Sequence, residues 1–292
     1  MNKAYIFAFI TIFLWGSTAA ISSLMLETLS TLGLVLYGSL TATCFLFVVN
    51  LFRKKLPELK KISLKELLVM FIASVLGIFL YNALLFFGMT RLLAQQAFII
   101  NYLWPIFIVI FSCVFAMDCL TAIKAISMIL SFIGVAIVAT GGDFSDLGKI
   151  DMVGVIACLL AAMFYGLFSV MTIKIQCDKF LAMMIYYFFS SVISALALLA
   201  TGGIALPESS HLPGILWIGV MTYGLAFSLW SIAIATGNTA RLSNLAYLTP
   251  FVSLIWIYFL IGEPITLASI IGLLIIISGV ILQMFDKTKK ER

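Results

Sequence analysis

The stretch Tyr102-Leu103-Trp104-Pro105 recurs 145 residues later as Tyr247-Leu248-Thr249-Pro250. With that offset held from 102 to 135, 8 of 34 positions are identical and no gap is needed. Gly134 then aligns with Gly279, and small residues of this kind let membrane helices approach closely. The match indicates an internal repeat with two close-packing glycines. Chance similarity between two apolar segments is the alternative.

Composition places this repeat in a membrane. Of 292 residues, 64% are hydrophobic and 10% are charged, whereas soluble domains have about 45–50% apolar and about 25% charged residues. A membrane-spanning helix needs about 20 apolar residues, and barrel strands are only about half as long. We therefore predict an all-α integral membrane protein with spans at 4–26, 31–52, 66–89, 92–115, 120–141, 151–174, 180–201, 212–236, 240–261 and 265–285.

Basic residues predict the orientation of these spans. With the N-terminus in the cytoplasm, 15 of the 17 Lys and Arg residues fall on the cytoplasmic side, and only Arg91 and Lys149 fall opposite. Such a bias predicts a multi-pass protein of the cell's inner (cytoplasmic) membrane with both termini cytoplasmic. Five spans in each copy is an odd number, so the second repeat, 142–292, is expected to be inverted relative to the first, 1–141.

Charge and motif content exclude several classes of function. All twelve acidic residues and the single His211 lie in loops or at span ends, whereas proton relays and acid–base enzymes need ionisable groups that converge at depth. The five cysteines form no CxxC pair, so neither a disulfide framework nor a metal site is expected. The phosphate-binding GxxxxGK[ST] motif is also missing. We expect no enzymatic activity, cofactor, metal, ATP or nucleic acid.

Two prolines interrupt the spans that carry the repeated stretch. Pro105 has no N–H to donate to the carbonyl of Asn101, and Pro250 has none for the carbonyl of Ala246. The freed carbonyls need other partners, which a water-filled cavity or a substrate ammonium supplies. Both prolines are therefore predicted to be structural.

Neutral residues at depth are the candidates for substrate binding. Asn101 and Trp104 are three residues apart and share a helix face, and Asn244 and Tyr247 repeat this spacing. For each asparagine a hydrogen bond to another helix is an equal alternative, and for each deep ring the alternative is packing in the protein interior. The candidates are Trp15, Tyr81, Asn101, Tyr102, Trp104, Tyr165, Trp230, Asn244 and Tyr247.

The segment Leu14-Trp15-Gly16 in the first span, together with the prolines in the fourth and ninth, resembles the EamA-type proteins of the drug/metabolite transporter superfamily over essentially the whole chain. Residues 101–105 are similar to the fourth-span motif of bacterial aromatic amino acid exporters, and Gly237-Asn238-Thr239 with 247–250 is similar to their eighth and ninth spans. The resemblance implies export of amino acids.

The resemblance also implies a central cavity lined by the first, third, fourth, sixth, eighth and ninth spans. Tyr81, Tyr102 and Trp104 would line it by motif match. The sequence departs from a symmetric pattern at Thr249, which occupies the position equivalent to Trp104.

We therefore expect a secondary transporter that exports a small zwitterionic or neutral metabolite, above all aromatic or hydrophobic amino acids, by alternating access. A substrate gradient or exchange would drive it. Export of cationic drugs or toxic metabolites through cation–π contacts is the first alternative. A non-transporting assembly or sensory factor is the second. The expected partners are the small-molecule substrate and the lipid bilayer, and a monomer is compatible with both.

Overall fold

The computed structural model describes residues 3–115, 120–144, 150–236, 242 and 245–283. Within these ranges the chain is helical and contains no strand. Eight helical stretches are long and apolar enough to cross a membrane, and two shorter apolar helices, Ala246–Ile261 and Leu267–Leu282, occupy the last two predicted spans. The prediction of an all-α membrane protein with ten helical spans is confirmed.

The spans of the first half include one continuous helix with a π-helical middle and one broken helix. They are α1 (Lys3–Leu26), α2 (Thr31–Phe52), α3–η2–α4 (Leu64–Ser74, Val75–Leu80 and Tyr81–Met89), α5 and α6 (Ala94–Asn101 and Trp104–Val114) and α7 (Ala122–Thr140).

The second half repeats this order. Its spans are α8 (Met152–Met171), α9 (Lys179–Thr201), α10–η6–α11 (Leu212–Leu216, Trp217–Ala226 and Phe227–Thr236), η7 and α13 (Ala246–Leu248 and Thr249–Ile261) and α14 (Leu267–Gln283). Short 3₁₀ turns precede or follow some spans, namely η1 (Leu56–Lys61), η4 (Thr172–Lys174) and η5 (Ser209–His211).

Side-chain caps explain where several helices begin. The Ser63 hydroxyl accepts a hydrogen bond from the Glu66 N–H, while Glu66 accepts one from the Ser63 N–H, which makes a capping box for α3. Asp151 accepts from the Gly154 N–H at the start of α8 in the same way. These caps satisfy N–H groups that have no partner inside the helix, and they fix the ends of the spans at the polar loops.

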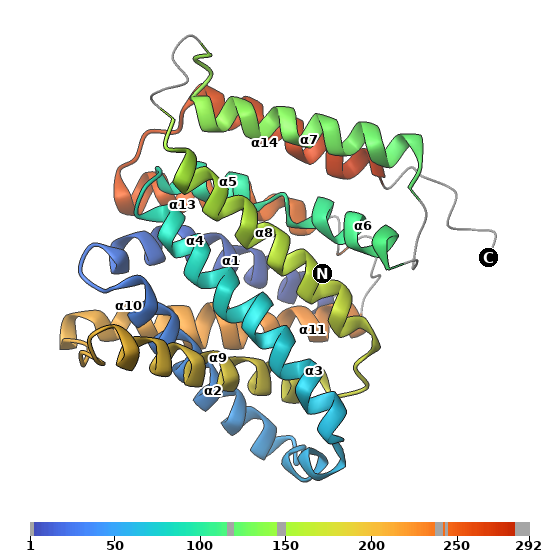
Figure 1. The fold of residues 1–292 in the computed structure, drawn as a ribbon, viewed down its shortest axis with the longest axis vertical. Coiled ribbons are helices and arrows are strands. Elements are labelled where there is room, and N and C mark those ends of the chain that lie inside the picture. The colour runs from blue at the N-terminus through green and yellow to red at the C-terminus, as the bar shows by residue number, and fades with distance from the viewer. Residues whose placement is uncertain (1–2, 116–119, 145–149, 237–241, 243–244, 284–292) are drawn as a thin grey trace.

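Equivalent helices of the two halves pack against each other. In Figure 1, α7 lies beside α14 at the top, and α2 lies beside α9 at the bottom. Between these pairs, α1 contacts α13 and α6 contacts α8, so the first span touches the ninth and the fourth touches the sixth. The two halves therefore interlock through matched pairs of helices, and the central helices enclose the space where a substrate site is expected.

The close approach of α7 and α14 depends on glycines. A Cβ atom placed on Gly134 would lie 2.7 Å from the carbonyl oxygen of Gly272, and one on Gly279 would lie 2.8 Å from that of Ser127. Real side-chain carbons do not approach backbone oxygen so closely, so only glycine fits at these crossings. Gly134 and Gly279 do pack closely between helices, as the sequence predicts.

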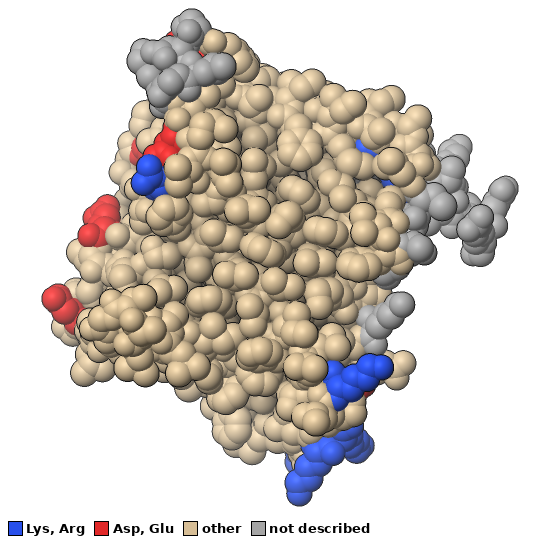
Figure 2. Space-filling model, viewed as in Figure 1, with Lys and Arg blue, Asp and Glu red and all other residues tan. Residues whose placement is uncertain are grey.

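Charged residues gather at the two ends of the helices. Figure 2 shows Lys and Arg mainly at one end of the visible face and Asp and Glu mainly at the other. Described residues at the second end include Glu27, Asp143, Asp151, Glu208 and Glu263, with Arg91 paired to Asp151 at 2.9 Å. That the basic end faces the cytoplasm stays a prediction.

Candidate functional site

A cavity of about 420 Å³ lies between the two halves. Its walls come from α1, the η2–α4 segment, α5 and α6, α8, α9, η6 and α11, η7 and α13. It is therefore bordered by seven of the ten spans, including α9, which the family resemblance does not imply. Its size falls within the about 300–1,000 Å³ typical of small-molecule sites.

The fourth span is broken where it borders the cavity. Its first part, α5, ends at Asn101, and α6 begins at Trp104 with Pro105 as its second residue. The Ile106 N–H donates to the carbonyl of Leu103 at 2.9 Å, which tightens the turn between the two parts. This break directs Asn101, Tyr102 and Trp104 into the cavity wall.

The ninth span has the equivalent break. A 3₁₀ turn, η7, precedes α13, which begins at Thr249 with Pro250 as its second residue. Ala246 and Thr249 line the cavity at this break. Pro105 and Pro250 are thus both the second residue of a helix that begins after a break, which agrees with the structural role predicted for them.

The third and eighth spans reach the cavity through π-helical segments. These are η2 at Val75–Leu80 and η6 at Trp217–Ala226, and they occupy equivalent places in the two halves. A π-helical segment widens the turn and reorients the residues that follow, and such segments are frequent at functional sites. Gly77 and Ile78 from η2, and Thr222 and Tyr223 from η6, line the cavity.

Aromatic rings from different spans contact one another around the cavity. Tyr165 of α8 lies against Tyr81 of α4 and Trp104 of α6, with ring centroids 4.9 and 5.4 Å apart. Trp15 of α1 contacts Trp230 of α11 at 5.4 Å. These contacts connect the two halves, so the wall offers several aromatic faces to a ligand.

Two asparagine–tyrosine pairs are the main polar features of the wall. The amide nitrogen Nδ2 of Asn101 donates to the Tyr81 hydroxyl at 3.2 Å. The Tyr223 hydroxyl donates to Oδ1 of Asn82 at 2.7 Å, and Nδ2 of Asn82 donates to the carbonyl of Ile78 at 2.8 Å. Each pair holds a tyrosine ring and an amide in fixed positions at the cavity surface.

The described lining contains aromatic, aliphatic, hydroxyl and amide groups, and none of its residues is Asp, Glu, Lys, Arg or His. The described lining therefore contains no ionisable side chain of the kind that binds an ion or transfers a proton within the membrane. Such a surface recognises a molecule by shape, ring stacking and neutral hydrogen bonds.

Seven of the nine predicted site residues line this one cavity: Trp15, Tyr81, Asn101, Tyr102, Trp104, Tyr165 and Trp230. Tyr247 is not part of the lining; it packs against the central hydrophobic core cluster. Asn244 lies outside the described residues. Contact of the seven with a substrate stays a prediction.

Several lining residues were not among the predicted set. Tyr187 of α9 stacks on Tyr223 of η6 with ring centroids 5.1 Å apart, and both line the cavity together with Thr222 and Phe227. The repeat does not single out Tyr223, because the residue 145 positions before it is the aliphatic Ile78, although both line the cavity.

One end of the cavity-lining helices is joined by a polar contact between the halves. The carboxylate of Glu263 accepts hydrogen bonds from the N–H groups of Ala94 and Gln95, at 3.1 and 3.3 Å. The Gln95 side chain donates to the carbonyl of Pro264 at 2.8 Å and accepts from the Thr266 N–H at 3.2 Å. The carboxylate of Glu263, from the second half, therefore caps the N-terminus of α5 in the first half.

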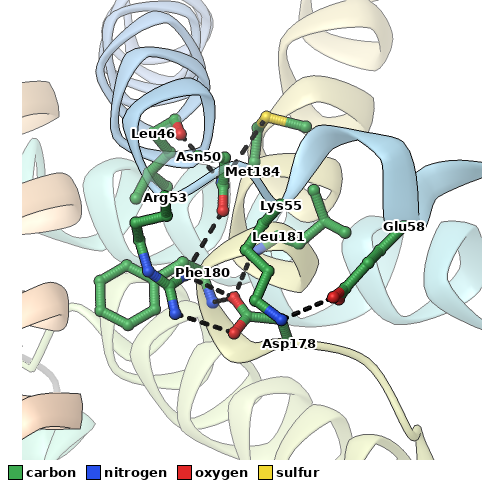
Figure 3. A network of polar contacts seen from close by, with 9 residues as sticks. All are labelled: Leu46, Asn50, Arg53, Lys55, Glu58, Asp178, Phe180, Leu181 and Met184. Carbon is green, nitrogen blue, oxygen red and sulfur yellow. Dashed lines mark hydrogen bonds and ion pairs between the residues drawn. The ribbon is translucent and has the colours of Figure 1, made fainter.

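The opposite end has a contact between helices outside the cavity. Arg53, after α2, makes a bidentate pair with Asp178, before α9, at 2.6 and 2.9 Å, and its guanidinium lies 4.0 Å from the ring centroid of Phe180 (Figure 3). Asp178 also accepts from the N–H groups of Phe180 and Leu181. Burial raises the pKa of Asp178, but these hydrogen bonds outweigh it and hold the pKa below its ordinary value.

A model of the EamA-like transporter family matches residues 2–140 and again residues 152–285. The chain belongs to the EamA-like transporter family. As an EamA-like protein it is a multi-pass membrane transporter with a small-molecule substrate.

Relatives agree with this assignment. The chain is 25% identical over 242 residues to the uncharacterized transporter YvbV of Bacillus subtilis, covering 81% of this chain and 78% of that protein. It is 24% identical over 299 residues to an uncharacterized transporter of Clostridium kluyveri, covering 99% and 95%. A crystal structure with 19% sequence identity matches the whole of both chains with a TM-score of 0.67, which shows a shared fold.

Proposed function

We propose that this EamA-like transporter is a secondary transporter that exports amino acids with aromatic or other hydrophobic side chains by alternating access. One observation carries the proposal: the cavity between the two halves is rich in aromatic rings, and its described lining contains no charged residue. An amino acid has a side chain that stacks on such rings. Its ammonium and carboxylate cancel in net charge, so no counter-ion in the wall is required.

The broken fourth and ninth spans support the polar part of this recognition. Pro105 removes the usual helical donor to the carbonyl of Asn101. The carbonyl of Ala246, which Pro250 was expected to free, instead accepts a hydrogen bond from the Thr249 N–H. In transporters with inverted repeats, broken helices at the interface of the repeats commonly bind the substrate near the middle of the membrane. The odd number of spans in each half makes inversion of the second half part of this proposal.

The two polar contacts between the halves suggest how access alternates. The Gln95–Glu263 contact joins the start of α5 to the segment that follows α13, and we infer that it breaks when this end of the cavity opens. The Arg53–Asp178 contact joins α2 and α9 outside the main aromatic wall, so it can persist while the halves rock. We infer that the first is a gate and the second a hinge.

Transport of labelled phenylalanine in proteoliposomes tests the proposal. We expect saturable counterflow, and we expect Trp104→Ala to reduce it at least tenfold by removing a ring from the cavity wall. Trp256→Ala is the matched control, because Trp256 contacts Phe13 and Trp217 outside the cavity lining. Lack of saturable flux for every amino acid in a full panel would reject the proposal.

Export of lipophilic cations is the second candidate, because the same rings favour cation–π contacts. Growth of an overexpressing strain on toxic amino acid analogues and on lipophilic cations separates the two. Resistance to the analogues alone is the outcome we expect, since among described residues no carboxylate lines the cavity to balance a net positive ligand.

The charge distribution predicts which way the transporter faces. With 15 of 17 basic residues on one side, that side is expected to be cytoplasmic and to contain both termini. A fluorescent-protein fusion at the C-terminus should therefore fluoresce, and alkaline phosphatase inserted after Ala205 should be active. The reverse pattern would contradict the orientation.

A further inference from the structure

Two polar atoms in the cavity wall lack a hydrogen-bond partner among the described residues: Oδ1 of Asn101 and Oγ1 of Thr249. Both residues are buried, at 4% and 5% exposure, and both line the cavity. A buried polar atom without a hydrogen-bond partner is destabilising. Both side chains belong to the cavity wall, but the two atoms have almost no accessible surface, so a ligand bonds to them only when neighbouring wall side chains shift.

The other two buried residues of the same types in the wall are satisfied. Asn82 uses its oxygen for Tyr223 and its nitrogen for the carbonyl of Ile78. The Thr222 hydroxyl donates to the carbonyl of Ile218 at 2.5 Å. Among the buried Asn and Thr side chains of the wall, Asn101 and Thr249 are therefore the two that have an atom without a partner among the described residues.

The two residues belong to the two breaks. Asn101 is the last residue of α5 in the first half, and Thr249 is the first residue of α13 in the second. In the alignment of the two repeats, Thr249 is equivalent to Trp104. The second half therefore has a hydroxyl where the first half has an indole ring. A ligand group that bonds to both would contact both halves of the transporter.

The chemistry of the two atoms indicates the group. The side-chain oxygen of Asn101 is a carbonyl oxygen and can only accept, while the Thr249 hydroxyl can accept as well as donate. A primary ammonium carries three donors and no acceptor, whereas a quaternary ammonium carries no donor. Trp104 and Tyr165 provide aromatic faces in the same wall, which attract a cation of either kind.

We propose that Asn101 and Thr249 together bind the protonated amino group of the ligand, so that the transporter requires N–H donors and discriminates against N-methylated analogues. This inference rests on the proposed transport of amino acids. It specifies the ligand group that is recognised, the protonated amino group, and the two residues that bind it. It also explains why quaternary cations would be excluded.

The test compares L-phenylalanine with its N,N,N-trimethyl derivative, which keeps the ring, the carboxylate and the positive charge. Binding is followed by quenching of tryptophan fluorescence, because Trp15, Trp104 and Trp230 line the cavity. We expect the trimethyl derivative to bind at least tenfold more weakly. Thr249→Val, which keeps the shape and removes the hydroxyl, should weaken phenylalanine binding about tenfold, or about 1.4 kcal/mol, and leave the trimethyl derivative unchanged.

Thr222→Val is the matched comparison inside the cavity, because its hydroxyl is already satisfied. It should change the affinity for both ligands by the same factor, so their ratio stays as in the wild type. Thr43→Val, on α2 outside the cavity lining, should change neither affinity. Asn101→Leu should remove the discrimination between the two ligands, and a melting curve shows whether that variant is folded.

Equal affinities of the wild type for the two ligands, or equal effects of Thr249→Val and Thr222→Val on their ratio, would overturn the inference. If no amino acid binds or moves, the proposed function fails, and the comparison is repeated with phenethylamine and its N,N,N-trimethyl derivative. A preference for phenethylamine that depends on Thr249 then supports the inference alone. Equal binding of the two amines, or no binding of either, overturns it.

Discussion

The amide of Asn82 is held by Tyr223 on one side and by the carbonyl of Ile78 on the other. Both bonds lie in the wall of the cavity, where Asn82 is only 4% exposed. Since water has little access to this amide, losing one partner leaves an acceptor without compensation. The position of the Tyr223 ring, and with it the stacked Tyr187, depends on the same bond.

Tyr223→Phe should therefore lower the stability of the folded protein. The change leaves Oδ1 of Asn82 without its donor, and the expected cost is about 1–3 kcal/mol. Thermal unfolding of the purified protein measures it as a lower Tm. Tyr258→Phe is the control, because Tyr258 lies on α13 with 51% of its surface exposed. Equal Tm values for the two variants would show that the Asn82 bond contributes little.

The sequence identifies six of the twelve aromatic residues in the cavity wall but not the hydrogen bonding of the wall. Trp15, Tyr165 and Trp230 can be selected because they lie away from the span ends, where Trp and Tyr usually act as interfacial anchors. The sequence does not show which asparagine has hydrogen-bond partners for its whole amide. Asn82 and Asn101 differ in this respect only because the fold places different neighbours beside them. Tyr187 lies on a span that the family pattern leaves out, so its contact with Tyr223 requires the structure.

At the scale of helices, the breaks follow from the sequence and the π-helical segments do not. A proline removes one hydrogen-bond donor, so Pro105 and Pro250 mark their breaks directly. The segments η2 and η6 have the same apolar composition as the α-helices around them. Their extra residue per turn is fixed by packing against neighbouring spans, which a single sequence does not display.

The contact between α7 and α14 should be sensitive to a single methyl group. A Cβ on Gly279 would lie 2.8 Å from the carbonyl oxygen of Ser127, so Gly279→Ala must push the helices apart. Overpacking of this kind costs about 1–3 kcal/mol. We expect a lower Tm for Gly279→Ala, while Ser278→Ala, at an exposed neighbouring position, should melt like the wild type. Unchanged melting of both would show that the two helices adjust freely.

The Gln95–Glu263 contact should control access to the cavity from its own end. Glu263→Ala removes the acceptor for the N–H groups of Ala94 and Gln95. With about 1 kcal/mol for the lost bonds, the closed arrangement should be populated about fivefold less. The measurement is labelling of Thr18→Cys, which lines the cavity, by an impermeant thiol reagent after the native cysteines are replaced.

The control for this labelling experiment is Glu27→Ala, at an exposed acid on the same end of the helices. It should leave the rate unchanged, whereas Glu263→Ala should raise it when the reagent is outside the cell. Equal rates for the two variants would contradict the role of the contact as a gate.

For the molecule as a whole, the Arg53–Asp178 pair should make stability depend on pH. The pKa of Asp178 lies below its ordinary value of 3.8, so the ionised form is favoured by folding. The stabilisation is fully present above that ordinary value and is lost as the pH falls through the lower pKa of the folded protein. Since the pair is partly exposed, its contribution should be only about 1 kcal/mol or less.

Asp178→Asn tests this, because an amide keeps the shape of the side chain and removes the charge. The variant should melt slightly below the wild type at pH 7, and the difference should shrink at pH values under 3.8. Glu27→Gln is the control for general loss of negative charge. A difference that grows toward low pH would have the wrong sign for this account.

The number of spans follows from hydropathy, because the bilayer imposes one length and one composition on every span. The pairing of α2 with α9 and of α7 with α14 cannot be predicted in this way, because any two apolar helices satisfy the same constraint. Gly134 and Gly279 predict where helices approach closely, but they do not predict which two helices meet there.

The uncharged cavity has an electrical consequence. Among the described residues, none that lines it carries a formal charge, so the rocking of the empty carrier moves no such charge through the membrane field there. A zwitterion crosses in the same way, with a net charge of zero. The membrane voltage would then neither drive nor oppose the exchange of amino acids, whereas a ligand with one positive charge would gain or lose about 2.3 kcal/mol for every 100 mV that it crosses.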